Sequence, residues 1–354
     1  MSLPPITVPT GAIRYNTDSN KMECFNGTKW MQIAVSSPDL GGNGGPAGDP
    51  TGNSADYVSG ARGFVMGGSY SSPGPGTHNE IRYITIPTAG NTTDFGNLTH
   101  TTRDGGSCAS RTRGLYRFGT GPGDINDNVD YITMSSTGDA GDFGDMGYNA
   151  RGTEGLSNAT RGIFVGGDND GSPRTYYNTI EYVTIASTGA GKDFGERVAG
   201  TGSRPAGGAS PTRGIMVGTN TSPYKQIDFI TIASAGVNAS DFGDALRVTT
   251  SSSSACSATR MVYGGASGPG EIDYLTIATT GNAVAFGDMT VDRSSFASAS
   301  DCIRGVFMGG DGSPAQFNEI DYITIATQGD AVDFGDLPYQ NQQCTGCSNG
   351  HGGL

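Results

Sequence analysis

The sequence has little positive charge and lacks long apolar runs. Its 21 Lys and Arg residues stand against 34 Asp and Glu residues, which gives a net charge of −13, and no basic cluster occurs. Such an acidic surface would repel phosphate backbones, so we expect no nucleic-acid partner. No apolar stretch approaches the roughly 18 residues of a membrane span, and the first residues lack the basic start and apolar core of a signal peptide. We therefore expect a protein that is made in a cytoplasm and does not insert into a membrane.

Histidine and tryptophan are scarce, which argues against catalysis. The three histidines are His78, His100 and His351, and none of them recurs or joins a nucleophile motif. The only tryptophan is Trp30, and the Ser-x-Asp-x-Gly-x-x-Trp box of sialidases is absent. We expect neither enzyme activity nor a cofactor. A carbohydrate-acting enzyme is the alternative, and a glycan-cleavage assay would detect it.

Glycine is abundant, at 59 of 354 residues, and a Phe-Gly pair recurs at intervals of 44 to 51 residues. A constant period near fifty indicates one structural unit stacked on itself. Asp precedes the Phe in five of the six copies, and Ala285 stands there in the fifth. Repetition favours a structural role over the metal-binding Asp-Phe-Gly of protein kinases. We expect Phe to fill space between units, Gly to permit a turn and Asp to cap backbone N–H groups. The six aromatic residues are Phe95, Phe143, Phe194, Phe242, Phe286 and Phe334.

Each copy carries the signals of several β-strands. An Arg opens a short apolar run that ends in Gly-Gly, as in residues 161–167, and a variable polar loop follows. An Ile-rich run comes next, as in residues 320–326, and small residues precede each Arg. Runs of five to eight β-branched and aromatic residues between glycines are typical of strands. Four short antiparallel strands per unit, packed on neighbouring units, describe a blade of a β-propeller.

The period, the strand that ends in Gly-Gly and the β-rich run after it resemble the kelch-type propeller over residues 54–354. The Trp that usually closes a kelch unit is missing, and the Phe of Asp-Phe-Gly takes its place. The resemblance implies an all-β, kelch-like propeller of about six four-stranded blades. A small-residue strand occurs both at 54–60 and at 344–350. One of these two completes the ring, and the sequence leaves open which one.

Residues 1–35 differ from the repeats and predict a small β-meander. Strands are expected at 12–16, 21–25 and 28–34, and Asn26-Gly27 is a tight hairpin signal. So short a segment buries too little surface to be stable alone, so we expect it to assemble with copies of itself or to dock on a larger body. Residues 36–53 are rich in Gly and Pro and are typical of a linker.

This N-terminal segment resembles a short module found at the start of tailed-phage fibres and other virion structural proteins, with cyanophages as a candidate source. The matching residues are Gly11, Ile13, Arg14, Tyr15, Asn16, Thr17, Asp18, Lys21, Glu23, Asn26, Gly27, Thr28 and Trp30. The resemblance implies location on a virion, attachment to other virion proteins through residues 1–36, and a homo-oligomer such as a trimer. The residues expected to anchor the module are Ile13, Tyr15, Phe25 and Trp30. The alternatives are a meander without an attachment role, a capsid-surface decoration protein, and an interaction propeller outside virions.

The loops after each Gly-Gly differ in length and content. Divergent loops on a rigid scaffold are how binding surfaces are built, although simple drift of loop sequences is the alternative. We predict that these loops contact a host-surface glycan or protein. The candidate binding residues are Tyr70, Asp124, Asp168, Asp170, Tyr176, Tyr224 and Asp311.

Two short motifs have the spacing of metal ligands. Asp168-Asn169-Asp170-Gly171 places oxygen ligands as a calcium loop does, but it lacks the downstream bidentate Glu, so a polar turn is the default. Cys344, Cys347 and His351 have the spacing of zinc ligands but number only three, at the end of the sequence. We predict no metal site. We expect Cys108, Cys256 and Cys302 to be small buried residues.

Overall fold

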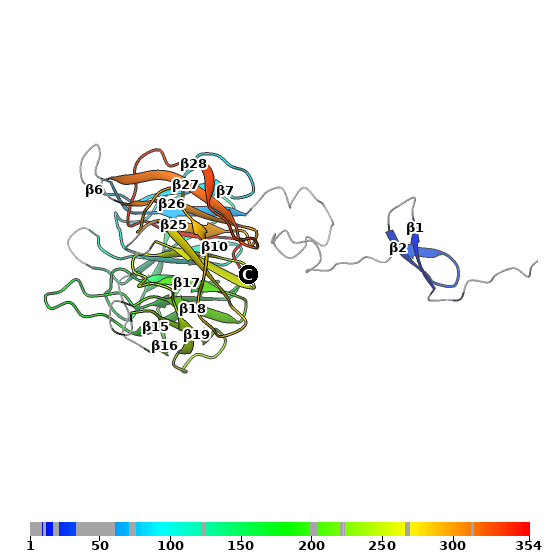
Figure 1. Cartoon of the computed structure of the whole chain (residues 1–354), viewed down its shortest axis with the longest axis horizontal. Helices are drawn as coiled ribbons and strands as arrows, with labels where there is room; N and C mark the ends of the chain where they lie inside the picture. The colour runs from blue at the N-terminus through cyan, green and yellow to red at the C-terminus, as the bar shows by residue number, and fades with distance from the viewer. Residues whose placement is uncertain are drawn as a thin grey trace, which may run out of the picture. The chain divides into compact units, whose positions relative to one another are not determined.

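The structure is a computed structural model that describes residues 9, 12–16, 21–32, 61–70, 76–121, 125–198, 204–219, 222, 224–265, 270–312 and 315–354. The chain divides into two compact units, Met1–Gly42 and Asn43–Leu354, and the division falls inside the segment predicted to be a linker. Figure 1 labels the strands of both units. The described residues form β-strands and no α-helix, so none of them belongs to a helix that could cross a membrane.

The N-terminal unit is a three-stranded antiparallel meander, as predicted. Its strands are β1 (Ile13–Asn16), β2 (Lys21–Phe25) and β3 (Trp30–Gln32), in that order. The turn between β2 and β3 forms because Asn26 Oδ1 accepts hydrogen bonds from the backbone N–H groups of Thr28 and Lys29, at 3.0 and 2.9 Å. Gly27 adopts a φ of 95°, which glycine tolerates without strain.

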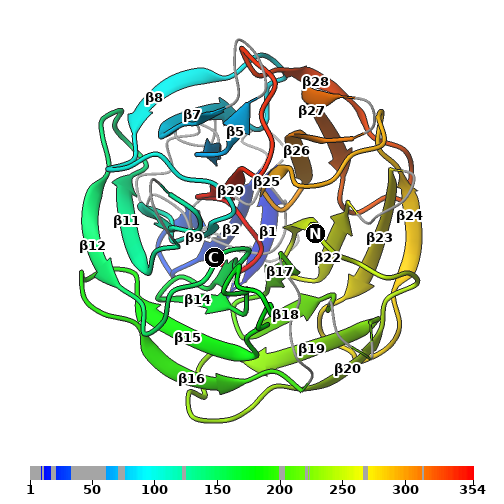
Figure 2. The ribbon, with the colours of Figure 1, turned by 90° about the vertical axis from the view of Figure 1, so that its left-hand side faces the viewer.

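The second unit is a propeller of six four-stranded antiparallel blades around a central axis (Figure 2). From the innermost strand outward, blade 1 contains β29 (Thr345–Ser348), β4 (Arg62–Met66), β7 (Glu80–Thr85) and β8 (Thr93–Asn97). Blade 2 contains β9 (Gly106–Ala109), β10 (Arg113–Arg117), β11 (Asn128–Thr133) and β12 (Gly141–Asp145). Blade 3 contains β13 (Glu154–Ser157), β14 (Arg161–Val165), β15 (Thr179–Thr184) and β16 (Lys192–Glu196).

The remaining three blades repeat the same order. Blade 4 contains β17 (Ala206–Ala209), β18 (Arg213–Val217), β19 (Gln226–Thr231) and β20 (Ser240–Asp244). Blade 5 contains β21 (Ser253–Cys256), β22 (Arg260–Gly264), β23 (Glu271–Thr276) and β24 (Val284–Asp288). Blade 6 contains β25 (Ala297–Ser300), β26 (Arg304–Asp311), β27 (Gln316–Thr324) and β28 (Val332–Asp336). A short hairpin, β5 (Ser69–Tyr70) and β6 (Gly76–Thr77), lies between β4 and β7.

The C-terminal strand closes the ring. β29 pairs antiparallel with β4, in a register that places Thr345 opposite Met66 and Ser348 opposite Gly63. The small-residue strand at 344–350 is therefore the one that completes blade 1. The competing stretch, residues 54–60, lies outside the described residues. Because blade 1 combines both ends of the propeller sequence, unfolding it requires the ring to open.

The Phe-Gly pairs lie at the contacts between neighbouring blades. All six Phe side chains are buried, at 0–4% exposure, and each packs with apolar residues of the next blade, as predicted. The carbonyl of each Phe accepts a hydrogen bond of 2.8–3.0 Å from the backbone N–H of a turn glycine in the next blade, as Phe95 does from Gly138. The predicted capping role of the Asp is confirmed at Asp142 and Asp193, which accept hydrogen bonds from the glycine two residues later.

The Arg that opens each second strand also joins two blades, a role that the sequence did not suggest. Each guanidinium lies 4.4–4.9 Å from the centre of an aromatic ring on the third strand of its own blade. Its Nη1 also donates a hydrogen bond of 2.6–3.2 Å to a backbone carbonyl of the next blade. The six residues are Arg62, Arg113, Arg161, Arg213, Arg260 and Arg304.

Candidate binding face around the channel mouth

The central channel is nearly filled by backbone. The six innermost strands consist mainly of Gly, Ala, Ser and Cys, and they enclose a cavity of about 50 Å³. Small residues are needed there because the strands approach closely; a Cβ on Gly155, for example, would collide with the carbonyl of Ser107. A cavity of this size accommodates one or a few water molecules. The channel is therefore no passage for a ligand.

The C-terminal residues close one end of the channel, and the C mark stands near the centre of the ring in Figure 2. His351 Nε2 lies 3.0 Å from the carbonyl oxygen of Ala109, and Gly353 N–H donates to His351 Nδ1 at 3.1 Å. Gly352 N–H donates to the carbonyl of Cys256. Burial lowers the pKa of His351 to about 4, so the ring is neutral, with the proton on Nε2.

The three candidate zinc ligands do not converge. Both ring nitrogens of His351 are engaged in the hydrogen bonds above. Cys344 packs in the apolar cluster shared with blade 6, whereas Cys347 packs in the cluster shared with blade 2. Both are free thiols, as are the buried Cys108 and Cys256 and the half-buried Cys302. Within the described part of the chain, no three His, Cys, Asp or Glu side chains are placed to hold a metal ion.

A ring of backbone hydrogen bonds surrounds the other end of the channel. One residue just before each innermost strand has a φ between 53° and 64°, and these residues are Asp104, Gly152, Arg204, Ser251, Ser295 and Gln343. In five of the six steps the N–H of one ring residue donates to the carbonyl of the ring residue in the preceding blade, at 2.6–2.9 Å. In the sixth, Ser252 N–H donates to Arg204 at 3.3 Å. The ring fixes the spacing of the blades at the mouth.

A buried ion pair crosses the mouth within this ring. Arg204 Nη1 lies 3.1 Å from Asp104 Oδ1, and the two side chains are 7% and 6% exposed. Arg204 Nη2 also donates to the carbonyl of Cys344 at 2.9 Å, and Gln343 donates to the second Asp104 oxygen at 3.1 Å. Burial raises the pKa of Glu154, deeper in the channel, well above its usual value, and Arg204 only partly offsets this. Because the ion pair closes this end of the channel and the cavity inside holds only water, any larger ligand must bind outside the channel.

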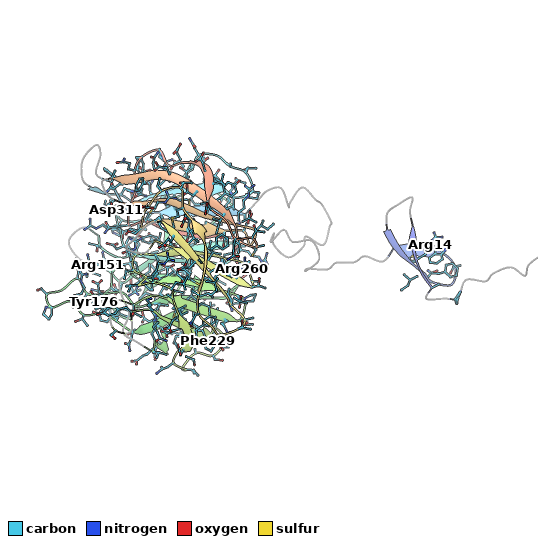
Figure 3. All side chains as sticks on the ribbon, in the orientation of Figure 1. Arg14, Arg151, Tyr176, Phe229, Arg260 and Asp311 are labelled. Carbon is cyan, nitrogen blue, oxygen red and sulfur yellow. The ribbon has the colours of Figure 1, made fainter. Side chains whose placement is uncertain are left out.

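The loops after the Gly-Gly pairs gather around the end of the channel that the hydrogen-bonded ring surrounds, and we call this side of the propeller the mouth face. Figure 3 places Asp311, Arg151 and Tyr176 on this same side. Tyr70 lines a pocket of about 350 Å³ on this face. Asp311 does not line the pocket but accepts a hydrogen bond from Gln342, which does. The other described residues that line the pocket are Ser69, Gly76, Thr77, Arg103, Thr120, Gly121, Gln316 and Gln342. They come from blades 1, 2 and 6. Asp124, another predicted residue, lies outside the described residues.

The predicted residues of the β14–β15 loop come together around two arginines, Arg151 and Arg174. Asp168 lies 3.1 Å from Arg151 Nε and 3.6 Å from Arg174 Nε. Asp170 pairs with the same two arginines, 3.2 Å from Arg174. Tyr176 hydrogen-bonds the Arg174 side chain and raises its pKa. The two carboxylates that suggested a calcium loop are thus each paired with two arginines of the chain itself.

Tyr224 lies apart from the other predicted residues. It lines a separate, more apolar groove of about 520 Å³ with Lys225, Leu246 and Val248. In the N-terminal unit, Ile13 is 62% exposed, and Phe25 and Trp30 pack against each other at 5.4 Å between ring centres. The side chain of Tyr15, the remaining predicted anchor, lies outside the described part.

Two residues of the Tyr70 pocket, Arg103 and Gln342, lie outside the loops that were predicted to bind a ligand. Arg103 and Gln342 each precede a small-residue strand and do not belong to the loops after Gly-Gly. The one available signal was that these positions vary from repeat to repeat while the strands around them do not.

Fold and mouth face together define a six-bladed β-propeller with a closed channel, a scaffold suited to interactions with other molecules. No known family model matches this chain, and no curated protein is similar to it.

Proposed function

We propose that this chain is a non-catalytic structural protein of a tailed-phage virion, of the fibre, neck or baseplate type. Its N-terminal unit anchors it to other virion proteins, and its propeller presents the mouth face to a glycan or protein of the host surface. The observation that carries the proposal is the difference in role between the repeated and the non-repeating residues of the propeller. The repeated residues join blades, whereas the non-repeating side chains collect around one pocketed face.

The N-terminal unit supports the anchoring part of the proposal. Its three short strands leave Ile13 and Met31 exposed, at 62% and 46%. Burial of these apolar side chains against a partner would stabilise the folded meander, which is too small to bury much surface by itself. Copies of the same unit, as in a trimer, or a neighbouring virion protein would provide that cover.

A deletion of residues 1–36 tests the proposal. The truncated chain should keep the thermal unfolding transition of the propeller, because that unit contains the closed ring of blades. It should be absent from purified particles assembled in its presence, whereas the full chain is incorporated. A full-length chain with Lys192→Gln, an exposed change on β16, is the matched control for incorporation. Normal incorporation of the truncated chain would exclude the anchoring role.

A further inference from the structure

Arg103 contributes the only full charge among the described residues that line the Tyr70 pocket. Its side chain is 37% exposed, and its Nε has no hydrogen-bond partner among the described residues. Among the described residues, the carboxylate that approaches Arg103 is that of Asp104, 4.0 Å away. Asp104 is already occupied by Arg204 and Gln343, each at 3.1 Å. Within the described part of the chain, the pocket therefore holds a cation whose charge is largely uncompensated.

In blade 3, the residue equivalent to Arg103 is Arg151, and its charge is compensated by a carboxylate. Arg103 and Arg151 both precede a residue of the mouth ring, and each forms an antiparallel bridge with a residue that follows the second strand of its blade. The bridge partner of Arg151 is Asp168, whose carboxylate lies 3.1 Å from the guanidinium. The bridge partner of Arg103 is Thr120, which has no charge. Among the described residues, the arginine of blade 3 is thus paired with an aspartate, whereas the arginine of blade 2 faces an uncharged threonine.

The lining of the pocket also offers an aromatic ring and fixed amide groups. Tyr70 packs against both His78 and Tyr339, with ring centres 5.9 and 6.0 Å away, and these two rings also contact each other. When the Gln342 amide is oriented to satisfy its neighbours, its nitrogen donates to Asp311 at 3.2 Å and its oxygen accepts from Gln316 at 2.5 Å. These contacts hold the wall in place, so a ligand meets a preorganised surface.

We propose that this pocket binds a carboxylate-bearing sugar unit of a glycan. Arg103 takes the carboxylate, because a guanidinium matches its geometry with two parallel N–H donors. Tyr70 offers its ring to the apolar face of the sugar, and Gln342 and Thr77, which line the same pocket, offer hydrogen-bonding groups to the hydroxyls. A volume of about 350 Å³ is within the usual range of small-ligand pockets. The proposal rests on the proposed function, since it names the host-surface ligand.

Titration calorimetry of the full chain with oligogalacturonate and with its carboxyl-reduced counterpart tests the proposal. We expect binding of the uronate and at least tenfold weaker binding of the reduced sugar, because a hydrogen-bonded charge pair is lost. Arg103→Gln should weaken uronate binding by about tenfold or more. Lys192→Gln removes one positive charge from an exposed site on β16, and its affinity should stay within about twofold of the unaltered chain.

Thr120→Asp is the decisive variant, because it copies into blade 2 the arrangement that pairs Arg151 in blade 3. It should abolish uronate binding and leave the unfolding temperature unchanged or raised, so misfolding would not explain the loss. Three results would overturn the proposal: equal binding of the reduced sugar, full binding by Arg103→Gln, or an acidic peptide that binds as tightly as the uronate in an Arg103-dependent manner.

The two proposals fail in different ways. If the chain requires residues 1–36 to enter virions but uronate neither binds nor competes with adsorption to host cells, only the ligand is wrong. If uronate binds through Arg103 while the truncated chain is incorporated normally, the ligand stands and the virion anchor is wrong.

Discussion

Gly335 and Gly90 face each other where blade 6 meets blade 1 and the ring closes. Their backbones are alike, with φ values of 151° and 153°. A Cβ on Gly335 would lie 2.6 Å from the carbonyl carbon and oxygen of Gly90, whereas a Cβ on Gly90 would meet no atom within 4 Å. Substituting either glycine with Ala therefore imposes the same kind of backbone strain, but only Gly335→Ala also creates a clash between the two blades.

The magnitude follows from the contacts at this seam. A side chain in this region of φ costs about 1–3 kcal/mol, and this cost applies to both variants. Gly335→Ala must also displace the Gly90 peptide, whose N–H donates to Phe334 at 2.8 Å. Losing that hydrogen bond adds about 1–3 kcal/mol. We expect Gly335→Ala to lower the free energy of unfolding by about 2 kcal/mol more than Gly90→Ala does.

Urea unfolding of the two variants measures this difference through the shift in midpoint, provided that the slope of the transition is unchanged. A thermal transition in which Gly335→Ala melts several degrees below Gly90→Ala would agree with it. Equal losses in the two variants would refute the reasoning. They would mean that this Gly is required for its backbone angle alone and not for the approach of the next blade.

Three further predictions concern the mouth, the closed end and the blade contacts. Arg204→Met should destabilise the chain by about 3–5 kcal/mol because it leaves Asp104 buried without its cation, and adding Asp104→Asn should restore part of the loss in a double-mutant cycle. Because burial lowers the pKa of His351 to about 4, below about 6.5 in the unfolded chain, stability should be full above about pH 6.5 and fall as the pH drops toward 4. The total loss should be about 3 kcal/mol, and His351→Gln should remove this pH dependence from urea midpoints measured across that window. Arg161→Gln should cost about 1–2 kcal/mol in thermal unfolding, because it removes both the contact with the Tyr182 ring and a hydrogen bond to blade 4, and no change would exclude the joining role.

Most of the fold could be predicted because its signals are local and repeated. Each unit shows β-branched runs bounded by glycine, and six copies of the Phe-Gly pair indicate six blades. The closing strand could not be chosen, because the pairing of β29 with β4 joins residues from opposite ends of the propeller sequence. Nothing in the local pattern at 54–60 or 344–350 distinguishes a strand that closes the ring from a spare copy.

The candidate site was predicted in part. Tyr70 lines a pocket and Asp311 supports its wall, because both follow a Gly-Gly at the end of a second strand. Asp168 and Asp170 were expected to be available to a ligand, but Arg151 and Arg174 pair with them. Arg103 was missed because its place in the pocket depends on blade 2 standing beside the hairpin of blade 1. Whether a charge is paired depends on neighbours that the order of residues does not reveal.

The amino-acid sequence by itself determined the number of blades, the strands within them and the acidic, glycine-rich composition, since each depends on residues close together in the chain. Tertiary structure decided which strand closes the ring, that the channel is shut at both ends, and which charges at its mouth remain available. These features arise where six innermost strands converge. There, Arg103 and Arg151 occupy the same position in the repeat and differ because one lies opposite Thr120 and the other opposite Asp168.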